Sequence, residues 1–139
     1  MTGKTSITVE AIINAPVEKV WKLWTVPQHI MQWNNASDDW HTPKAENDLR
    51  VGGKFSSRME AKDGSFGFDF WGVYDEVKPN QVIAYTIGDG RKVKITFISQ
   101  DNATKVTVTF EAENQNPIDM QRGGWQSILN NFKKYAEAN

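Results

Sequence analysis

The last part of the chain carries apolar residues at intervals of three and four positions. This spacing predicts a single long amphipathic helix over Asn116–Asn139. Its apolar stripe contains Trp125, Ile128, Leu129, Phe132, Tyr135 and Ala136. A helix of roughly 20 residues spans about 30 Å, which is the width of a small domain. A stripe this long and this aromatic requires an apolar surface of similar length to lie against.

Alternating polar and apolar residues earlier in the chain predict that surface. Ser6–Ile13 alternates as a half-buried strand, and two short helices follow it, one from Val17 to about Thr25 and one beginning at Pro27. The segment from Asn34 to Asp48 is polar and irregular, with one short strand plausible around Trp40. About six strands then precede the long helix, and their turn signals are Asp63-Gly64, Lys78–Asn80, Gly88–Gly90 and Asp101-Asn102.

Short hairpins make the predicted sheet antiparallel, so the sequence predicts an α+β fold in which a curved sheet wraps the C-terminal helix. A type I′ turn at Asp63-Gly64 fixes the register of its hairpin. The predicted cross-strand pairs there are Met59–Phe68, Ser57–Phe70 and Phe55–Gly72 on one face, and Arg58–Asp69 and Ser56–Trp71 on the other. The later hairpins predict Tyr74–Tyr85, Phe97–Val106, Ile95–Val108 and Val93–Phe110.

The start of the long helix carries two further signals. Asn116 is the expected N-cap, with Pro117 at the first helical position and Asp119 at the capping-box position. Two successive glycines, Gly123 and Gly124, each cost a helix roughly 1 kcal/mol relative to alanine. Either the regular helix begins after them, or the backbone there approaches a neighbour closely.

Composition narrows the classes of function. A chain of 139 residues without cysteine suits one domain, residues 1–139, with no disulfide framework and no thiol nucleophile. No apolar run has the length of a signal core or a membrane span, which indicates a cytoplasmic protein without membrane insertion. The net charge of −1 offers no general attraction for nucleic acid. Six Trp and seven Phe favour an aromatic-lined pocket.

Several motifs, in order along the chain, resemble those of one family. They are Ala15–Trp21, Trp33, Asp48–Phe55, Asp63-Gly64, Phe70–Val73, Thr104–Val108, Gly124-Trp125 and Leu129. Together they resemble the START-like helix-grip superfamily (SRPBCC), and within it the bacterial homologues of the activator of the ninety-kilodalton heat-shock protein's ATPase. The resemblance implies a curved antiparallel sheet of six to seven strands, a hydrophobic cavity against the C-terminal helix, and relatives that bind lipids, sterols or polyketides, act as cyclases, or contact chaperones.

The leading hypothesis is therefore a binding module for a small hydrophobic ligand, monomeric or weakly dimeric, with no cofactor and no metal. The predicted ligand-binding residues are Trp24, Trp33, Trp40, Phe55, Phe68, Phe70, Tyr85, Trp125 and Leu129. One alternative is a chaperone-interacting domain that stimulates a heat-shock ATPase. The other is a cyclase or hydrolase in the same cavity, for which His41 is the candidate base. No catalytic residue is assigned, and the Arg58–Asp69 pair is interpreted as a surface ion pair.

Overall fold

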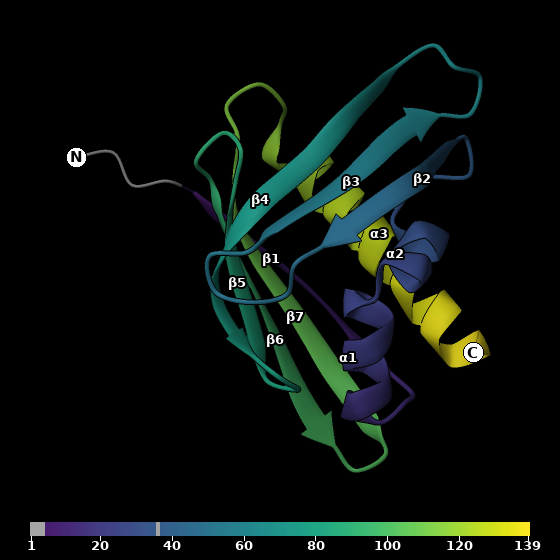
Figure 1. Ribbon diagram of the computed structural model, residues 1–139, viewed down its shortest axis with the longest axis vertical. Coiled ribbons are helices and arrows are strands. Elements are labelled where there is room, and N and C mark those ends of the chain that lie inside the picture. The colour runs from purple at the N-terminus through teal and green to yellow at the C-terminus, as the bar shows by residue number, and fades with distance from the viewer. Residues whose placement is uncertain (1–4, 36) are drawn as a thin grey trace.

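The computed structural model describes residues 5–35 and 37–139, and within these ranges the chain forms seven strands and three helices. The strands build one antiparallel sheet with the order β1-β7-β6-β5-β4-β3-β2. They are β1 (Ser6–Ile13), β2 (Trp40–Asn47), β3 (Lys54–Ala61), β4 (Gly67–Lys78), β5 (Val82–Ile87), β6 (Lys92–Gln100) and β7 (Ala103–Glu111). The helices are α1 (Val17–Thr25), α2 (Pro27–Trp33) and α3 (Ile118–Ala138). The sheet curls, α3 crosses it, and α1 and α2 lie near the C-terminal half of α3 (Figure 1). The predicted α+β helix-grip architecture is confirmed.

Two irregularities bend the strands on the β2 side of the sheet. The β4–β5 register shifts between Tyr74 and Glu76, and the β2–β3 register shifts between His41 and Lys44. A bulge of this kind adds an unpaired residue and increases the local bend and twist of its strand. The sheet can therefore curve around a helix instead of remaining an open, evenly twisted layer.

At the opposite edge of the sheet, α3 is bound to the backbone of β1. The Lys133 ammonium donates to the carbonyl of Ile12 at 2.6 Å, and the Gln126 side-chain amide donates to the carbonyl of Glu10 at 3.3 Å. Carbonyls of an edge strand otherwise have no partner within the sheet. These bonds satisfy part of the β1 edge and set the position of the helix across it.

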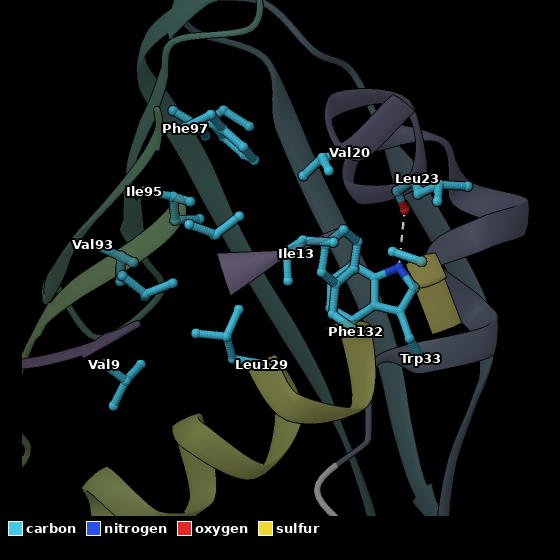
Figure 2. Packing of buried hydrophobic residues seen from close by; sticks show 14 of the residues in the cluster. Val9, Ile13, Val20, Leu23, Trp33, Val93, Ile95, Phe97, Leu129 and Phe132 are labelled. Carbon is cyan, nitrogen blue, oxygen red and sulfur yellow. Dashed lines mark hydrogen bonds between the residues drawn. The ribbon is translucent and has the colours of Figure 1, made fainter. Parts of the chain in front are cut away.

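An aromatic cluster of the core lies where the C-terminal half of α3 meets α1 and α2. Phe132 is fully buried, and its ring centroid lies 4.8 Å from that of Trp24 and 4.9 Å from that of Trp33, in edge-to-face geometry. The Trp33 indole donates to the Leu23 carbonyl at 2.9 Å, which joins α2 to α1 (Figure 2). β6 side chains such as Ile95 belong to the same cluster (Figure 2).

All the strand pairs predicted from the hairpin signals are present in the structure. The turn type at Asp63-Gly64 is different from the prediction, because only Gly64 has a positive φ, at 77°. A type I′ turn requires a positive φ at both central residues. The register survives because the Ala61 amide still bonds to the Phe66 carbonyl across the loop.

Two local predictions are wrong and one is right only in part. The short strand considered around Trp40 is present, but as β2 it is longer than expected: it takes up most of the segment expected to be irregular and pairs with β3 over its length apart from the bulge. Asn116 does not cap α3: its side chain donates to Glu113, and Pro117 occupies the N-cap position without a side-chain cap. Neither explanation offered for Gly123 and Gly124 holds, because both lie inside α3 and a Cβ atom on either would meet nothing within 4 Å.

Alanine at these two glycines tests this description of α3. We expect Gly123→Ala and Gly124→Ala each to raise the free energy of unfolding by up to about 1 kcal/mol, because the methyl group enters open space and the unfolded chain loses freedom. The measurement is urea denaturation followed by circular dichroism. The control is Gly72→Ala, whose Cβ would lie 2.7 Å from the Thr86 carbonyl oxygen and 2.8 Å from the Phe55 ring, and which should lose stability. Destabilisation by the helix variants would contradict the geometry.

Candidate functional site

A cavity of about 340 Å³, partly open to solvent, lies between the concave face of the sheet and α3. Its size is at the lower end of the roughly 300–1,000 Å³ that is usual for small-molecule sites. Strands β3, β4 and β5 form one wall, and the opposite wall comes from α3 and the short helices. Most of the lining side chains are aromatic or aliphatic.

Eight of the nine residues predicted to bind a ligand line this cavity. They are Trp24, Trp33, Phe55, Phe68, Phe70, Tyr85, Trp125 and Leu129. The ninth, Trp40, lies outside the lining and contacts the rings of Phe66 and Phe68, whose centroids are 6.0 and 6.1 Å from its own. The structure therefore gathers these residues around one space, and their role in binding stays a prediction.

A glycine in β4 determines how the sheet wall is packed. Gly72 lies opposite Phe55, and the Phe55 ring occupies the space that a Cβ on Gly72 would need. Seated there, the ring makes an edge contact with Tyr85 at 4.6 Å and a tilted contact with Tyr74 at 5.3 Å. The result is a wall of rings that support one another.

Trp125 closes the helix side of the cavity. Its indole stacks on Phe110 of β7, with ring centroids 4.1 Å apart and planes inclined by 11°. The Phe70 ring in β4 lies nearly perpendicular to it, with ring centroids 6.3 Å apart. One α3 side chain thus spans between two strands that are far apart in the sheet order, so the position of Trp125 depends on the curl of the sheet.

Sequence reasoning missed the remaining lining residues. They are Ile30, Asn34, Glu46, Asn47, Ser57, Met59, Ile83, Arg91, Ile95, Val108 and Ile128. Tyr74 also lines the cavity, and the sequence suggested it only as a group that could hold a polar end of the ligand. Alternation along β3 places Ser57 and Met59 on the same face as Phe55, so the strand pattern contained the signal for these two. No comparable sequence signal marks Arg91, which directly follows a turn.

Two tyrosines of the wall differ in their hydrogen bonding. The Tyr74 hydroxyl donates to the Asn47 side-chain oxygen, and the Asn47 amide donates to the Thr25 carbonyl at 2.6 Å. The Tyr85 hydroxyl bonds to no other described residue; the residue is only 8% exposed and lines the cavity. Burial raises the pKa of both hydroxyls far above the ordinary tyrosine value, so both remain protonated donors at neutral pH.

Two charged residues are part of the cavity lining, Glu46 and Arg91. The Glu46 carboxylate lies 3.2 Å from the Lys44 ammonium, and both side chains are largely exposed. The Arg91 side chain is only 20% exposed, and its Nε donates to Asp89 at 2.8 Å. The arginine is therefore the more buried of the two charges.

The residues of the alternative hypotheses lie elsewhere. His41 is on β2, with its Nε2 atom 3.8 Å from a Glu60 carboxylate oxygen, and is not part of the cavity lining. Arg58 reaches Asp69 at 3.5 Å on the face of β3 away from the cavity, and its Nε donates to Glu60 at 2.9 Å.

Among the residues that the structure describes, no group of three His, Asp or Glu side chains could hold a metal ion. No helix in that part of the chain is long and apolar enough to cross a membrane.

A curled antiparallel sheet around a C-terminal helix, with a cavity between them, defines the START-like helix-grip class of proteins. The profile of the family described as "Activator of Hsp90 ATPase homolog 1-like protein" matches residues 14–137. The chain belongs to this family, and the resemblance stated from its motifs is confirmed.

Solved structures agree with this assignment. The solution structure of an AHSA1-like protein from Aeromonas hydrophila is 45% identical, with a TM-score of 0.91 over 96% of this chain and 93% of that one. The solution structure of Chr148 from Cytophaga hutchinsonii is 54% identical, with a TM-score of 0.83 over 96% of this chain and 93% of that one. Protein CV1439 from Chromobacterium violaceum shares the fold at 22% identity, with a TM-score of 0.86 over 97% of this chain and 99% of that one. A comparison with curated proteins finds no match.

Replacing the two tyrosines one at a time tests the hydrogen bonding in the cavity wall. We expect Tyr74→Phe to lower the free energy of unfolding by about 1 kcal/mol, because the Asn47 oxygen loses its donor. We expect Tyr85→Phe to change it by less than about 0.5 kcal/mol, because no bond within the protein is lost. Urea denaturation measures both values. Equal losses would mean that the Tyr85 hydroxyl has a partner in the folded protein.

Proposed function

We propose that this protein binds a small, largely apolar molecule in the cavity between α3 and the concave face of the sheet. The single observation that carries the proposal is a space of about 340 Å³ walled by aromatic rings in a domain whose core is otherwise closely packed. Burying apolar ligand surface there contributes about 25 cal/mol per Å². Rings such as Phe55, Tyr85 and Trp125 suit flat or branched ligands.

The wall is also preorganised for binding. Phe55 is held by Gly72 and Tyr85, and Trp125 is held by Phe110, so the cavity-facing rings are fixed before a ligand arrives. Side chains that are already ordered lose little conformational entropy on binding. The proposed ligands include fatty acyl chains, sterols and aromatic polyketides.

The six tryptophans of the chain allow the test to locate a bound ligand. Trp24, Trp33 and Trp125 line the cavity, whereas Trp71 lies on the other face of the sheet beneath the Lys54 ammonium. We expect at least one member of a panel of acyl esters, sterols and flat aromatic ketones to shift the indole N–H resonances of the lining tryptophans in ¹⁵N-labelled protein. The Trp71 resonance should stay in place.

Two neighbouring serines of β3 give a matched pair of variants. Ser57→Leu places a larger side chain in the cavity, and Ser56→Leu places the same side chain on the opposite face. We expect Ser57→Leu to weaken binding by about tenfold or more, since a ligand forced against filled space costs about 1–3 kcal/mol. Ser56→Leu should bind as the wild type does. Absence of any shift with the whole panel, or equal effects of the two variants, would refute the proposal.

A second candidate function is stimulation of a heat-shock ATPase. The family description names activators of Hsp90 ATPase, and the β3–β4 hairpin presents Phe66, which is 61% exposed, beside Phe68 and Trp40. Exposed apolar clusters of this kind mark contact surfaces.

Under this hypothesis the purified protein raises the ATPase rate of a bacterial Hsp90, and Phe66→Ser abolishes the increase without affecting ligand binding. Val51→Ser, at another exposed apolar position, is the control. An unchanged ATPase rate with the wild-type protein would exclude this function.

A further inference from the structure

The cavity lining contains a tyrosine and an arginine from neighbouring parts of the sheet, Tyr85 and Arg91. Tyr85 of β5 lies opposite Val93 of β6, and the Ile87 amide bonds to the Arg91 carbonyl at 2.9 Å. Tyr85 and Arg91 are therefore diagonal neighbours on the concave face of two paired strands. Side chains in this relation have Cα atoms about 7–8 Å apart, a distance that long side chains can bridge.

Both groups have hydrogen-bonding capacity that the protein leaves unused. The Tyr85 hydroxyl bonds to no other described residue, and burial raises its pKa, so it stays a donor. Of the Arg91 nitrogens, Nε donates to Asp89 at 2.8 Å and Nη1 reaches the Glu111 carbonyl at 3.4 Å, whereas Nη2 has no partner in the described part of the chain. A guanidinium offers five N–H donors in a planar fork that fits a carboxylate.

Arg91 already interacts with acceptors of the protein. They are the Asp89 carboxylate, the Glu111 carbonyl and the Glu113 carboxylate, whose pKa is lowered by hydrogen bonds from Asn116 and also by the charge of Arg91. Elsewhere in the wall, Tyr74 and Asn47 bond to each other, and the Glu46 carboxylate lies beside Lys44 near solvent. The Tyr85 hydroxyl and the Nη2 group of Arg91 are the donors that the protein leaves for a ligand acceptor.

We propose that the ligand of this cavity is a carboxylic acid with an apolar body, and that its carboxylate accepts hydrogen bonds from Arg91 and Tyr85 together. This proposal rests on the proposed binding function and specifies the class of ligand. Asp89, and more weakly Glu113, already offset the charge of Arg91, so the site suits a single negative charge better than the double charge of a phosphate monoester.

The test compares ligands that share a chain and differ in the head group: dodecanoate, methyl dodecanoate and dodecyl phosphate. Binding is followed by the indole N–H resonances of Trp24 and Trp125. We expect wild-type protein to bind dodecanoate about tenfold or more tightly than methyl dodecanoate, as is usual for hydrogen bonds to a charged group. Dodecyl phosphate should bind more weakly than dodecanoate.

Variants then assign the preference to the two donors. Arg91→Gln and Tyr85→Phe should each reduce the acid-to-ester affinity ratio severalfold, because each removes a donor that bonds more strongly to a carboxylate than to an ester carbonyl. Tyr85→Phe guards against loss of folding, because it removes no hydrogen bond within the protein. Lys94→Gln removes a charge from an exposed position of the same strand as Val93 and should preserve the ratio.

Each outcome has a definite meaning. Binding of acid and ester with equal affinity by the wild type would overturn this inference and leave the proposed binding function intact. Tighter binding of dodecyl phosphate, or a ratio unaffected by both variants, would also overturn it. Binding of no ligand in this set or in the apolar panel would refute the binding function and the inference together.

Discussion

The structure depends on the contact between the C-terminal half of α3 and the aromatic side chains of α1 and α2. Phe132 is fully buried between Trp24 and Trp33, and the Asn131 amide donates to the Trp33 carbonyl at 2.9 Å. This contact fixes α2 against α3, and the hydrogen bonds from Lys133 and its neighbours fix α3 against β1. With both attachments in place, the helix crosses the sheet at one position only.

The cavity is a consequence of that arrangement. Along α3, Leu129, Phe132 and Ala136 are buried completely, whereas Trp125 and Ile128 are only half-buried. The helix is thus packed on its C-terminal half and stands away from the β3–β4 wall on its N-terminal half. The space does not close because the rings around it are supported by one another, and rings in contact cannot collapse into a void without breaking those contacts.

The wall of the cavity carries a few polar groups among its apolar side chains. Tyr74 and Asn47 bond to each other, whereas the Tyr85 hydroxyl bonds to no other described residue. In small-molecule sites, a few placed donors contribute orientation and specificity rather than most of the binding free energy. Under the proposed function, the apolar wall attracts an apolar body and these donors recognise its polar end.

How much of the structure the sequence predicts depends on whether the interactions join residues that are near or distant in the sequence. Alternation and turn residues are local, and they predicted the strands and hairpin pairs, including Phe55 opposite Gly72. The turn at Asp63-Gly64 was wrong in type and right in register, because the register is set by the pairing of both faces along the whole hairpin. Asn116 was wrong as an N-cap because Glu113 binds its side chain instead.

The sequence by itself determined the order of the elements, the stripe of α3 that must be buried, and most of the aromatic residues that gather on the concave face. Only the tertiary structure decided that Trp40 lies outside the cavity, that Arg91 lies on it, and that a space remains at all. These facts depend on how far a helix stands from a curved sheet. That separation is set by side chains distant in the sequence, such as Trp33, Phe110 and Phe132, which no local pattern relates to one another.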